Sequence, residues 1–171
     1  EGCAFFRADG GAGQPDVQCH FIPFMLGHRG RSIVWGAGYF ADVVVCRPKS
    51  RGALTIGTDP YAPQIDLNLL HDQRDLDLLV QGIARLRQIL SKAPLEPHRA
   101  PEVHPGAQIT GTALADHIRA SCGTAYHPVG TVAMGVDPAR PVAPDLRLRG
   151  YDNLFVADAS VMPAVTSANT N

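Results

Sequence analysis

The sequence predicts an α+β protein in which a largely antiparallel sheet is flanked by helices. Short apolar segments follow one another before residue 57, without the dozen-residue crossovers that parallel strands require. One longer segment, Gln73 to Leu90, repeats apolar residues at helical spacing. Strands first, then a helix, then loops and a late apolar run: this order is typical of α+β proteins and not of alternating βαβ units.

The first elements are strands separated by turns. Residues 9–16, with the sequence DGGAGQPD, are predicted to form a loop because Gly and Pro disfavour both regular structures. Val17 to Ile22 alternates apolar and polar residues as a half-buried strand does, and Pro23 ends it. Further strands are predicted over 31–35, 40–46 and 53–56, with a turn over 47–52.

Helices and one late strand follow. Asp72 is the predicted N-cap of the 73–90 helix, and the prolines after it prevent its continuation. The charged residues of this helix are expected on faces other than the apolar one: Asp75, Asp77, Arg85 and Arg87. A short helix is predicted from Ala113 to Ser121, capped by Thr112, and a buried strand from Asn153 to Val156.

The composition narrows the possible functions. The 171 residues allow one domain, or at most two small ones, and Lys plus Arg number 15 against 16 Asp plus Glu. Such a balance argues against a nucleic-acid partner, and no segment approaches the ~20 apolar residues of a membrane helix. Four widely spaced cysteines, Cys3, Cys19, Cys46 and Cys122, are expected to be buried free thiols.

Residues 36–41 match the GxGxxA form of the dinucleotide-binding fingerprint. That motif requires a helix directly after the glycines, so that its N-terminal amides can hold a pyrophosphate. Asp42-Val43-Val44-Val45 follows here, which favours a strand. We therefore interpret the glycines as turn residues of a hairpin, and expect no phosphate-binding loop from them.

The residues with the most chemical interest lie between Tyr126 and Asn171. His127 precedes Pro128 in a Gly-rich loop, so its backbone is expected to be extended. Asp158 follows an apolar run at the carboxyl end of the predicted late strand, the end at which nucleotide-binding sheets hold ligands. Asn169 and Asn171 add two amides that can donate and accept hydrogen bonds.

Taken together, these segments resemble a known family. The motifs are His127-Pro-Val-Gly-Thr131, Met134-Gly135, 153–160 (NLFVADAS), Pro163 and Asn169-Thr170-Asn171. Their order and spacing resemble the C-terminal signature of the glucose–methanol–choline (GMC) oxidoreductases, in the branch that is similar to choline dehydrogenase. Residues 47–66 resemble the family's substrate-domain hairpin, and 72–86 resemble the helix after it.

The resemblance implies a role for each site residue. His127 matches the family's catalytic histidine, and Asn169 its second active-site position. Asp158 and Ala159 match the pair that touches the flavin ribityl and phosphate region. Thr170 and Asn171 match the stretch that lines the flavin ring, and Tyr126 a position beside it. A zinc or other metal site is not implied.

The resemblance also implies a function and a domain organisation. Residues 1–125 would belong to the substrate-binding domain, and 126–171 to the catalytic loop and a C-terminal segment of the FAD domain. The Rossmann half that binds FAD is expected in a missing N-terminal region, because the chain begins without Met and lacks that motif. The implied activity is FAD-dependent oxidation of a primary alcohol, with oxygen or a quinone-type carrier as final acceptor. The alternative is a substrate-binding or interaction module that cannot bind FAD by itself.

Some of these residues also allow other interpretations. The segment 17–24, with Trp35 and Tyr39, is expected either to line the substrate cavity or to be plain core. A hydrolase is disfavoured because Ser160 stands outside any GxSxG elbow. Zinc binding by Cys19, His20, Cys46 and Cys122 would need these distant residues to converge in space.

Overall fold

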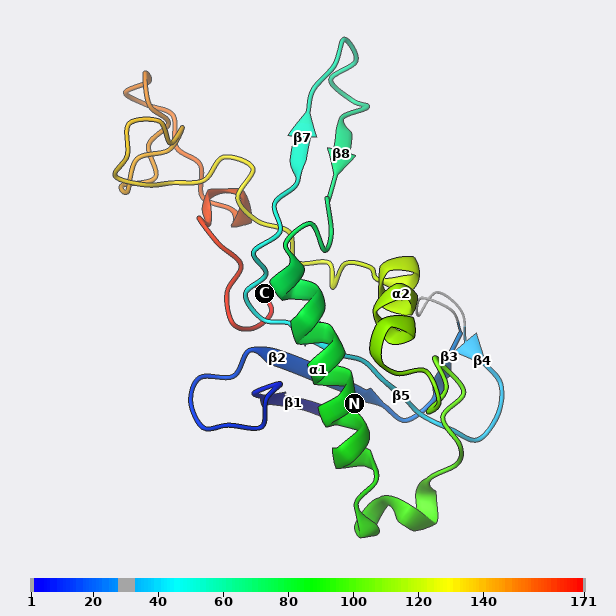
Figure 1. The fold of residues 1–171 in the computed structure, drawn as a ribbon. Helices are drawn as coiled ribbons and strands as arrows, with labels where there is room; N and C mark the ends of the chain where they lie inside the picture. The colour runs from blue at the N-terminus through cyan, green and yellow to red at the C-terminus, as the bar shows by residue number, and fades with distance from the viewer. Residues whose placement is uncertain (1, 28–32, 171) are drawn as a thin grey trace. The chain divides into compact units, whose positions relative to one another are not determined.

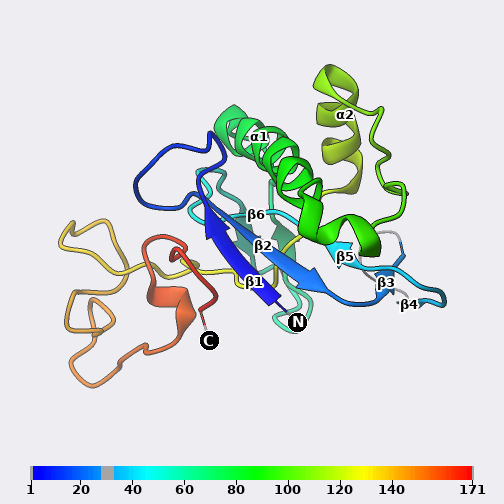
Figure 2. The same cartoon turned by 90° about the horizontal axis from the view of Figure 1, so that it is seen from below.

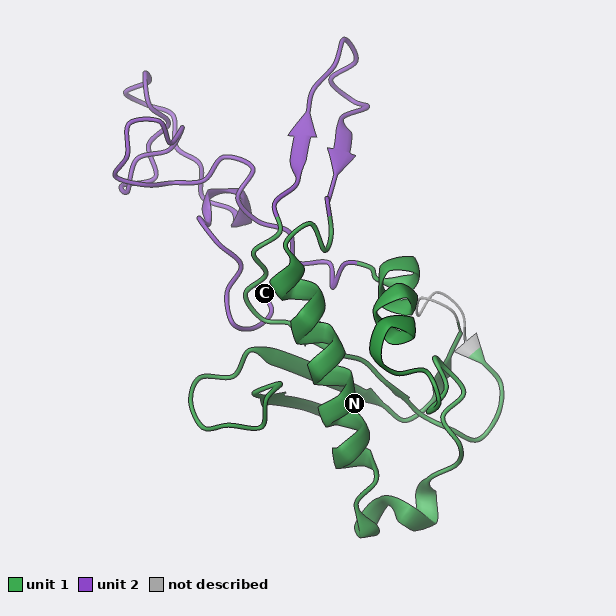
Figure 3. Cartoon of the chain, viewed as in Figure 1, with its two compact units in different colours: residues 1–50, 69–123 green, residues 51–68, 124–171 purple. Residues whose placement is uncertain are grey.

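The structure is a computed structural model that describes residues 2–27 and 33–170. The chain divides into two compact units, coloured separately in Figure 3. Unit 1 comprises residues 1–50 and 69–123, and unit 2 comprises 51–68 and 124–171. The hairpin region 51–68 therefore clusters with the C-terminal segment, whereas the expected domain boundary at 125/126 stays a prediction about the whole protein.

An antiparallel sheet forms one layer of unit 1 (Figure 1). Strand β2 (Val17–Ile22) pairs with β1 (Gly2–Phe6) on one side and with β5 (Phe40–Ala41) and β6 (Val44–Val45) on the other. A separate small sheet pairs β3 (Met25–Leu26) with β4 (Ile33–Val34). The mixed helical and antiparallel fold confirms the predicted class.

The predicted strand over 40–46 is interrupted at Asp42. Strands β5 and β6 share one register against β2, since Phe21 faces Ala41 and Gln18 faces Val44. Between them, the Asp42 carboxylate accepts the backbone N–H of His20 at 3.0 Å, which replaces part of the ladder. The prediction over 31–35 is likewise shortened to β4, and residues 31 and 32 lie outside the described residues.

Helix α1 (Gln73–Leu90) crosses one face of the sheet (Figure 2). Its bounds are those predicted, and the Asp72 side chain accepts the N–H of Arg74 as an N-cap should. At Gly82 a Cβ would lie 2.7 Å from a Val43 methyl, so glycine permits the close approach of helix and strand. Leu76, at 1% exposure, packs with Leu114 and Ile118 in the core of the unit.

One charged residue of α1 is not where the sequence predicts it. Asp75 is only 3% exposed, although the helical pattern places it on a polar face. Its carboxylate accepts the backbone N–H groups of Lys49 and Ser50 and the Ser50 hydroxyl, at 2.6–3.0 Å. These bonds offset the cost of burying the charge and attach the chain after β6 to the helix.

The connections after α1 also differ from expectation. A 3₁₀ helix, η2 (Ala93–His98), occupies the Pro-rich segment, because proline is tolerated at the start of a helix. Helix α2 (Gly111–Ser121) begins before the predicted Ala113. Its N-cap is Thr110, without a side-chain bond, so the assignment of Thr112 as cap was wrong.

Unit 2 contains little regular structure. Strands β7 (Ala53–Thr55) and β8 (Gln64–Asp66) form a two-stranded hairpin, and η3 (Ala159–Val161) is a single 3₁₀ turn. The expected buried strand over 153–156 is wrong: only Phe155 bridges to Arg147, and Phe155 is 58% exposed. Two backbone hydrogen bonds, from Leu148 N–H to the Leu154 carbonyl and from Val156 N–H to the Leu146 carbonyl, pair the run with residues 146–148 over this single bridge only.

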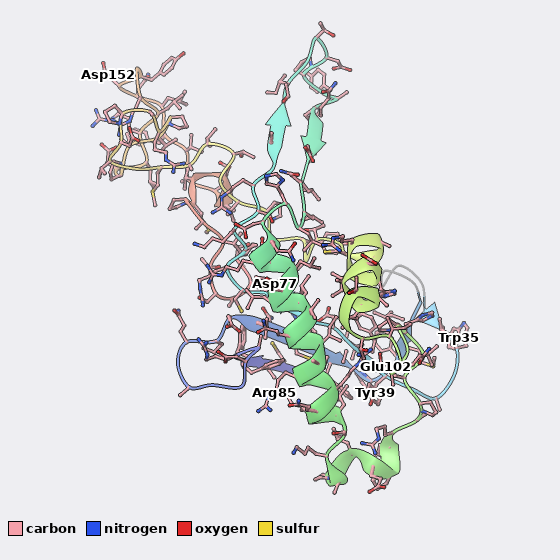
Figure 4. All side chains as sticks on the ribbon, in the orientation of Figure 1. Trp35, Tyr39, Asp77, Arg85, Glu102 and Asp152 are labelled. Carbon is pink, nitrogen blue, oxygen red and sulfur yellow. The ribbon has the colours of Figure 1, made fainter. Side chains whose placement is uncertain are left out.

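The cysteines are all free, but not all are buried. Cys19 and Cys46 are buried and Cys122 is half-buried, whereas Cys3 is exposed, which corrects the expectation for that residue. Trp35 is not core either, since its side chain is 93% exposed (Figure 4). Tyr39 stacks against Phe21 with ring centroids 4.9 Å apart. None of the helices described is long and apolar enough to span a bilayer.

Candidate functional site

The loop that carries His127 is shaped by unusual backbone conformations. Tyr126 has a positive φ of 66°, and its side chain is 75% exposed. Gly130 has a φ of 88°, and a Cβ there would lie 3.1 Å from the Met162 carbonyl. Glycine at this position therefore allows both the turn and the close approach of the 162 segment.

The chain after this loop runs alongside η3. Three backbone N–H groups donate to carbonyls of that turn: Gly130 to Ala159 at 3.3 Å, Val132 to Ser160 at 3.1 Å and Met134 to Val161 at 2.8 Å. These main-chain bonds hold the segment that follows His127 against the 159–161 turn.

The His127 ring is half-buried and held on one side. Its Nδ1 lies 3.1 Å from the Thr170 hydroxyl oxygen, and the Thr170 backbone N–H also points at Nδ1 from 3.4 Å. In the described part of the chain, Nε2 has no hydrogen-bond partner. A ring oriented through Nδ1 with an open Nε2 is arranged to exchange a proton with a small molecule.

Asp158 caps η3. Its Oδ1 accepts the Ser160 N–H at 2.8 Å, and hydrogen bonding by Ser160, through its side chain and then its backbone, lowers the pKa of this carboxyl. The side chain is exposed and is charged at neutral pH. A carboxylate there accepts hydrogen bonds from hydroxyl groups, such as those of a sugar-alcohol chain, and repels a phosphate.

The other residues predicted for the site differ in their exposure to solvent. Ala159 is half-buried and offers its carbonyl to Gly130, and Asn169 is exposed next to Thr170. Asn171 lies outside the described residues. The contact that the sequence did not reveal is Thr170 with His127: 43 residues separate them, and no local pattern signals the pair.

The glycine motif over 36–41 does not form a nucleotide-binding loop. Strand β5 begins at Phe40, so no helix follows the glycines, as predicted. The turn joins two different sheets, which corrects the interpretation as a single hairpin. Gly38 has its own packing reason: a Cβ there would lie 2.6 Å from the Met25 Cγ.

Metal-ligating residues do not cluster in the part of the chain that the structure describes. No group of three or more His, Cys, Asp or Glu is placed to hold an ion. The Cys19 thiol is instead buried, and this desolvation, with smaller effects of Asp42 and Cys3, raises its pKa to about 11.

The sequence of this chain is similar to those of known oxidoreductases. Residues 48–171 match the family model described as GMC oxidoreductase. The chain is 37% identical to an alcohol dehydrogenase [acceptor] of Pseudomonas putida and 36% identical to an oxygen-dependent choline dehydrogenase of Rhizobium rhizogenes. All of the chain aligns in both cases, and it spans 32% of each relative, about a third of their length.

Solved structures show the same fold. Pyridoxine 4-oxidase from Mesorbium loti superposes with a TM-score of 0.88 and 32% identity, over 98% of this chain and 34% of that one. A formate oxidase from Aspergillus oryzae, studied for its FAD modification, superposes with a TM-score of 0.81 and 26% identity, over 92% and 29%.

Proposed function

The chain belongs to the GMC oxidoreductases, as their C-terminal portion, and we propose that it supplies the catalytic base of an FAD-dependent enzyme that oxidises a primary alcohol to an aldehyde. The observation that carries this proposal is the His127 imidazole, held at Nδ1 by Thr170 and open at Nε2. The names of the two relatives, an alcohol and a choline dehydrogenase, support an alcohol as substrate.

The proposed role of His127 is to take the hydroxyl proton. For Nε2 to hold a lone pair, Nδ1 must carry the hydrogen and donate it to the Thr170 hydroxyl, and the Thr170 backbone N–H, 3.4 Å from Nδ1, then makes no hydrogen bond to that atom. The Nε2 lone pair accepts the proton of the alcohol. The resulting imidazolium keeps its bond to Thr170, which is stronger once the donor is charged. A positioned general base typically contributes about 10²–10⁴-fold to a rate.

Asn169 is proposed as the second contact to the same oxygen. An amide donates hydrogen bonds but does not accept a proton near neutral pH, so His127 is the base of the pair. Two fixed donors around the developing alkoxide stabilise its charge and set the orientation of the carbon. FAD, when bound, supplies the acceptor for the hydride that leaves that carbon, and the product is an aldehyde.

The residues of this chain fit one end of FAD. Thr170 lies beside His127, and the exposed Asp158 carboxylate and the small Ala159 side chain are groups that suit the ribityl and flavin end. Tyr126, Asn169 and Asn171 are proposed to complete that contact. The pyrophosphate needs a helix N-terminus after a glycine turn, and the 36–41 turn is followed by a strand. We therefore assign the nucleotide end to an N-terminal region that lies outside this chain.

Because a strand and not a helix follows the 36–41 turn, a second function is proposed for this chain when it is separated from the N-terminal region. Without the N-terminal region, the chain would be a substrate-binding or interaction module that does not retain FAD. Purifying the 171 residues in the presence of FAD tests this directly. A colourless protein is expected, and a stably yellow one would contradict the assignment of the nucleotide end.

The experiment for the full function uses a protein that also contains the N-terminal region. Under anaerobic conditions, a series of primary alcohols is mixed with the yellow protein and the flavin absorbance is followed. Bleaching by at least one alcohol, with formation of the aldehyde, is the expected result. A yellow, folded protein that no alcohol in a broad screen reduces, with or without an artificial electron acceptor, would refute the proposal.

A further inference from the structure

The β7–β8 hairpin has two chemically different faces. Leu54 and Ile65 are direct register partners, so their side chains lie on the same face. By the alternation of a strand, Ile56 and Leu67 extend that face, and the opposite face carries polar or small residues. The polar side consists of Ala53, Thr55, Gln64 and Asp66.

The apolar face is not covered within the described chain. Leu54 is 44% exposed, Ile56 65%, Ile65 64% and Leu67 42%, and Tyr61 beyond the strands is 94% exposed. Figure 1 draws β7 and β8 as the arms of one hairpin. Its two strands make one two-stranded sheet. Such a sheet is marginally stable in water unless it packs against something else.

The hairpin is nonetheless built to keep this shape. At its base, Asn68 donates from its side-chain amide to the Arg51 carbonyl at 2.9 Å, and Gly52 lies so close to the Asp66 carbonyl that no side chain would fit. At its tip, the Asp59 carboxylate accepts the Tyr61 N–H at 2.9 Å. The exposed apolar residues are thus presented by a defined β-ribbon.

The rest of unit 2 also buries few apolar side chains. Among its described residues, the buried apolar side chains are Ala133, Val142 and Val161. Large side chains of the same unit are exposed as well, including Val136 at 87% and Phe155 at 58%. A unit with so little buried surface of its own requires a further surface to stabilise it.

The comparisons indicate where that surface lies. The hairpin falls inside the matched family region, 48–171, and the fold superposes over 98% of this chain on a protein of which it is only 34%. In such relatives, about two thirds of the chain is available to cover the unit in cis. The exposed face carries no charge, so an uncharged, apolar surface is the complement.

We propose that the Leu54/Ile56/Ile65/Leu67 face of the β7–β8 hairpin is the docking surface for an apolar surface of the N-terminal region of the same polypeptide. The contact joins the C-terminal unit that carries His127 to the region that is assigned the nucleotide. It rests on the chain being the C-terminal part of a longer protein, as the proposed function does, but it does not require His127 to be a base.

Hydroxyl-radical footprinting of the longer protein tests this without any substitution. Side-chain oxidation rates of Leu54, Ile65 and Thr55 are measured in the native protein and after unfolding in urea. We expect Leu54 and Ile65 to be protected by about fivefold or more on folding and Thr55 far less, at every protein concentration. Oxidation of Leu54 and Ile65 at unfolded rates would overturn the proposal. Protection only where the protein self-associates would also overturn it, and would assign the face to a second copy.

A matched pair of variants gives a second measurement. Ile65→Asp places a charge on the apolar face, and Thr55→Asp places the same charge on the polar face of the same hairpin. Ile65→Asp is expected to lower the thermal midpoint of the longer protein and to increase the loss of FAD on gel filtration, while Thr55→Asp behaves as the parent. Equal behaviour of the two variants would contradict the docking surface. Protection of the hairpin in a protein that fails the alcohol screen would leave this inference standing and refute only the proposed chemistry.

Discussion

The two units of this chain are built on different principles. Unit 1 has a sheet with a long helix across one face, and Leu76, Leu114 and Ile118 form its core. Unit 2 holds its segments together mainly by backbone hydrogen bonds, such as those from 130–134 to η3, and buries few side chains. The candidate site lies in unit 2. The chemistry is therefore assigned to the part of the chain that depends most on a surface outside it.

The largest expected effect is a difference between the two units in the unfolding free energy that is lost when a buried side chain is truncated. Leu76→Ala removes a side chain that is 1% exposed and is expected to cost about 2–5 kcal/mol of unfolding free energy. Val161→Ala, in unit 2 at 7% exposure, is expected to cost about 1 kcal/mol, because fewer atoms are lost. Urea unfolding followed by circular dichroism measures both. Equal losses would show that unit 2 has a core as cooperative as that of unit 1.

Substitution of the buried carboxylate Asp75 in unit 1 is expected to have the next largest effect on the free energy of unfolding. Asp75→Asn turns an amide toward the donors of Lys49 and Ser50, so about 2–3 kcal/mol of stability should be lost. The matched control is Asp77→Asn, two residues further along α1 and exposed on the opposite side of the helix, for which less than about 0.5 kcal/mol is expected. The same urea titration compares them. If the two substitutions cost the same, Asp75 does not connect the chain after β6 to α1.

The thiol of Cys19, in strand β2, reports on the sheet of unit 1. Since burial raises the pKa of Cys19 to about 11, this thiol is expected to resist alkylation at pH 8, where only about a thousandth is thiolate. The rate should rise as the pH approaches 11, because the thiolate fraction grows until the pKa is passed. Mass spectrometry of iodoacetamide adducts, with the exposed Cys3 as internal reference, measures it. Rapid modification of Cys19 at pH 8 would show an open sheet.

Substitution of Thr170 in unit 2 is expected to have a smaller effect, and to act on the rate of flavin reduction. In the longer protein, Thr170→Val removes the hydroxyl beside His127 Nδ1 and should slow flavin reduction by about tenfold. Thr170→Ser keeps the hydroxyl and should retain most of the rate. A pH profile of reduction for both variants separates proton transfer from folding. If Val and Ser slow the reaction equally, the hydroxyl does not orient the imidazole.

Elements with strong periodicity could be predicted from the sequence. The helix over 73–90 was located with its cap, because apolar residues recur at helical spacing between Asp72 and Pro94. Strand β1 (Gly2–Phe6) was missed because GCAFF has no alternation that marks a strand. The run 153–156 was predicted to be buried because an apolar run signals contact with some surface, and the described chain does not supply that surface.

The sequence proposes the candidate site as a set of residues, but it does not specify the contacts among them. The motifs around His127 and Asp158 identify the family, and the structure joins their backbones through 130–134 and 159–161. The pairing of His127 with Thr170 depends on a long-range fold that no spacing rule specifies. Asp75 shows the same limit in unit 1, since helical periodicity cannot reveal that backbone donors of residues 49 and 50 meet a charged residue.

The role of His127 is tested most directly by single-turnover reduction of the flavin. The longer protein is prepared as parent, His127→Ala and His98→Ala, the last being an exposed histidine on η2 that serves as control. Each is mixed anaerobically with an alcohol that reduces the parent. The account predicts that His127→Ala keeps its FAD and slows reduction by about 10²–10⁴-fold, while His98→Ala matches the parent. Reduction of the His127→Ala flavin at nearly the parental rate would contradict it.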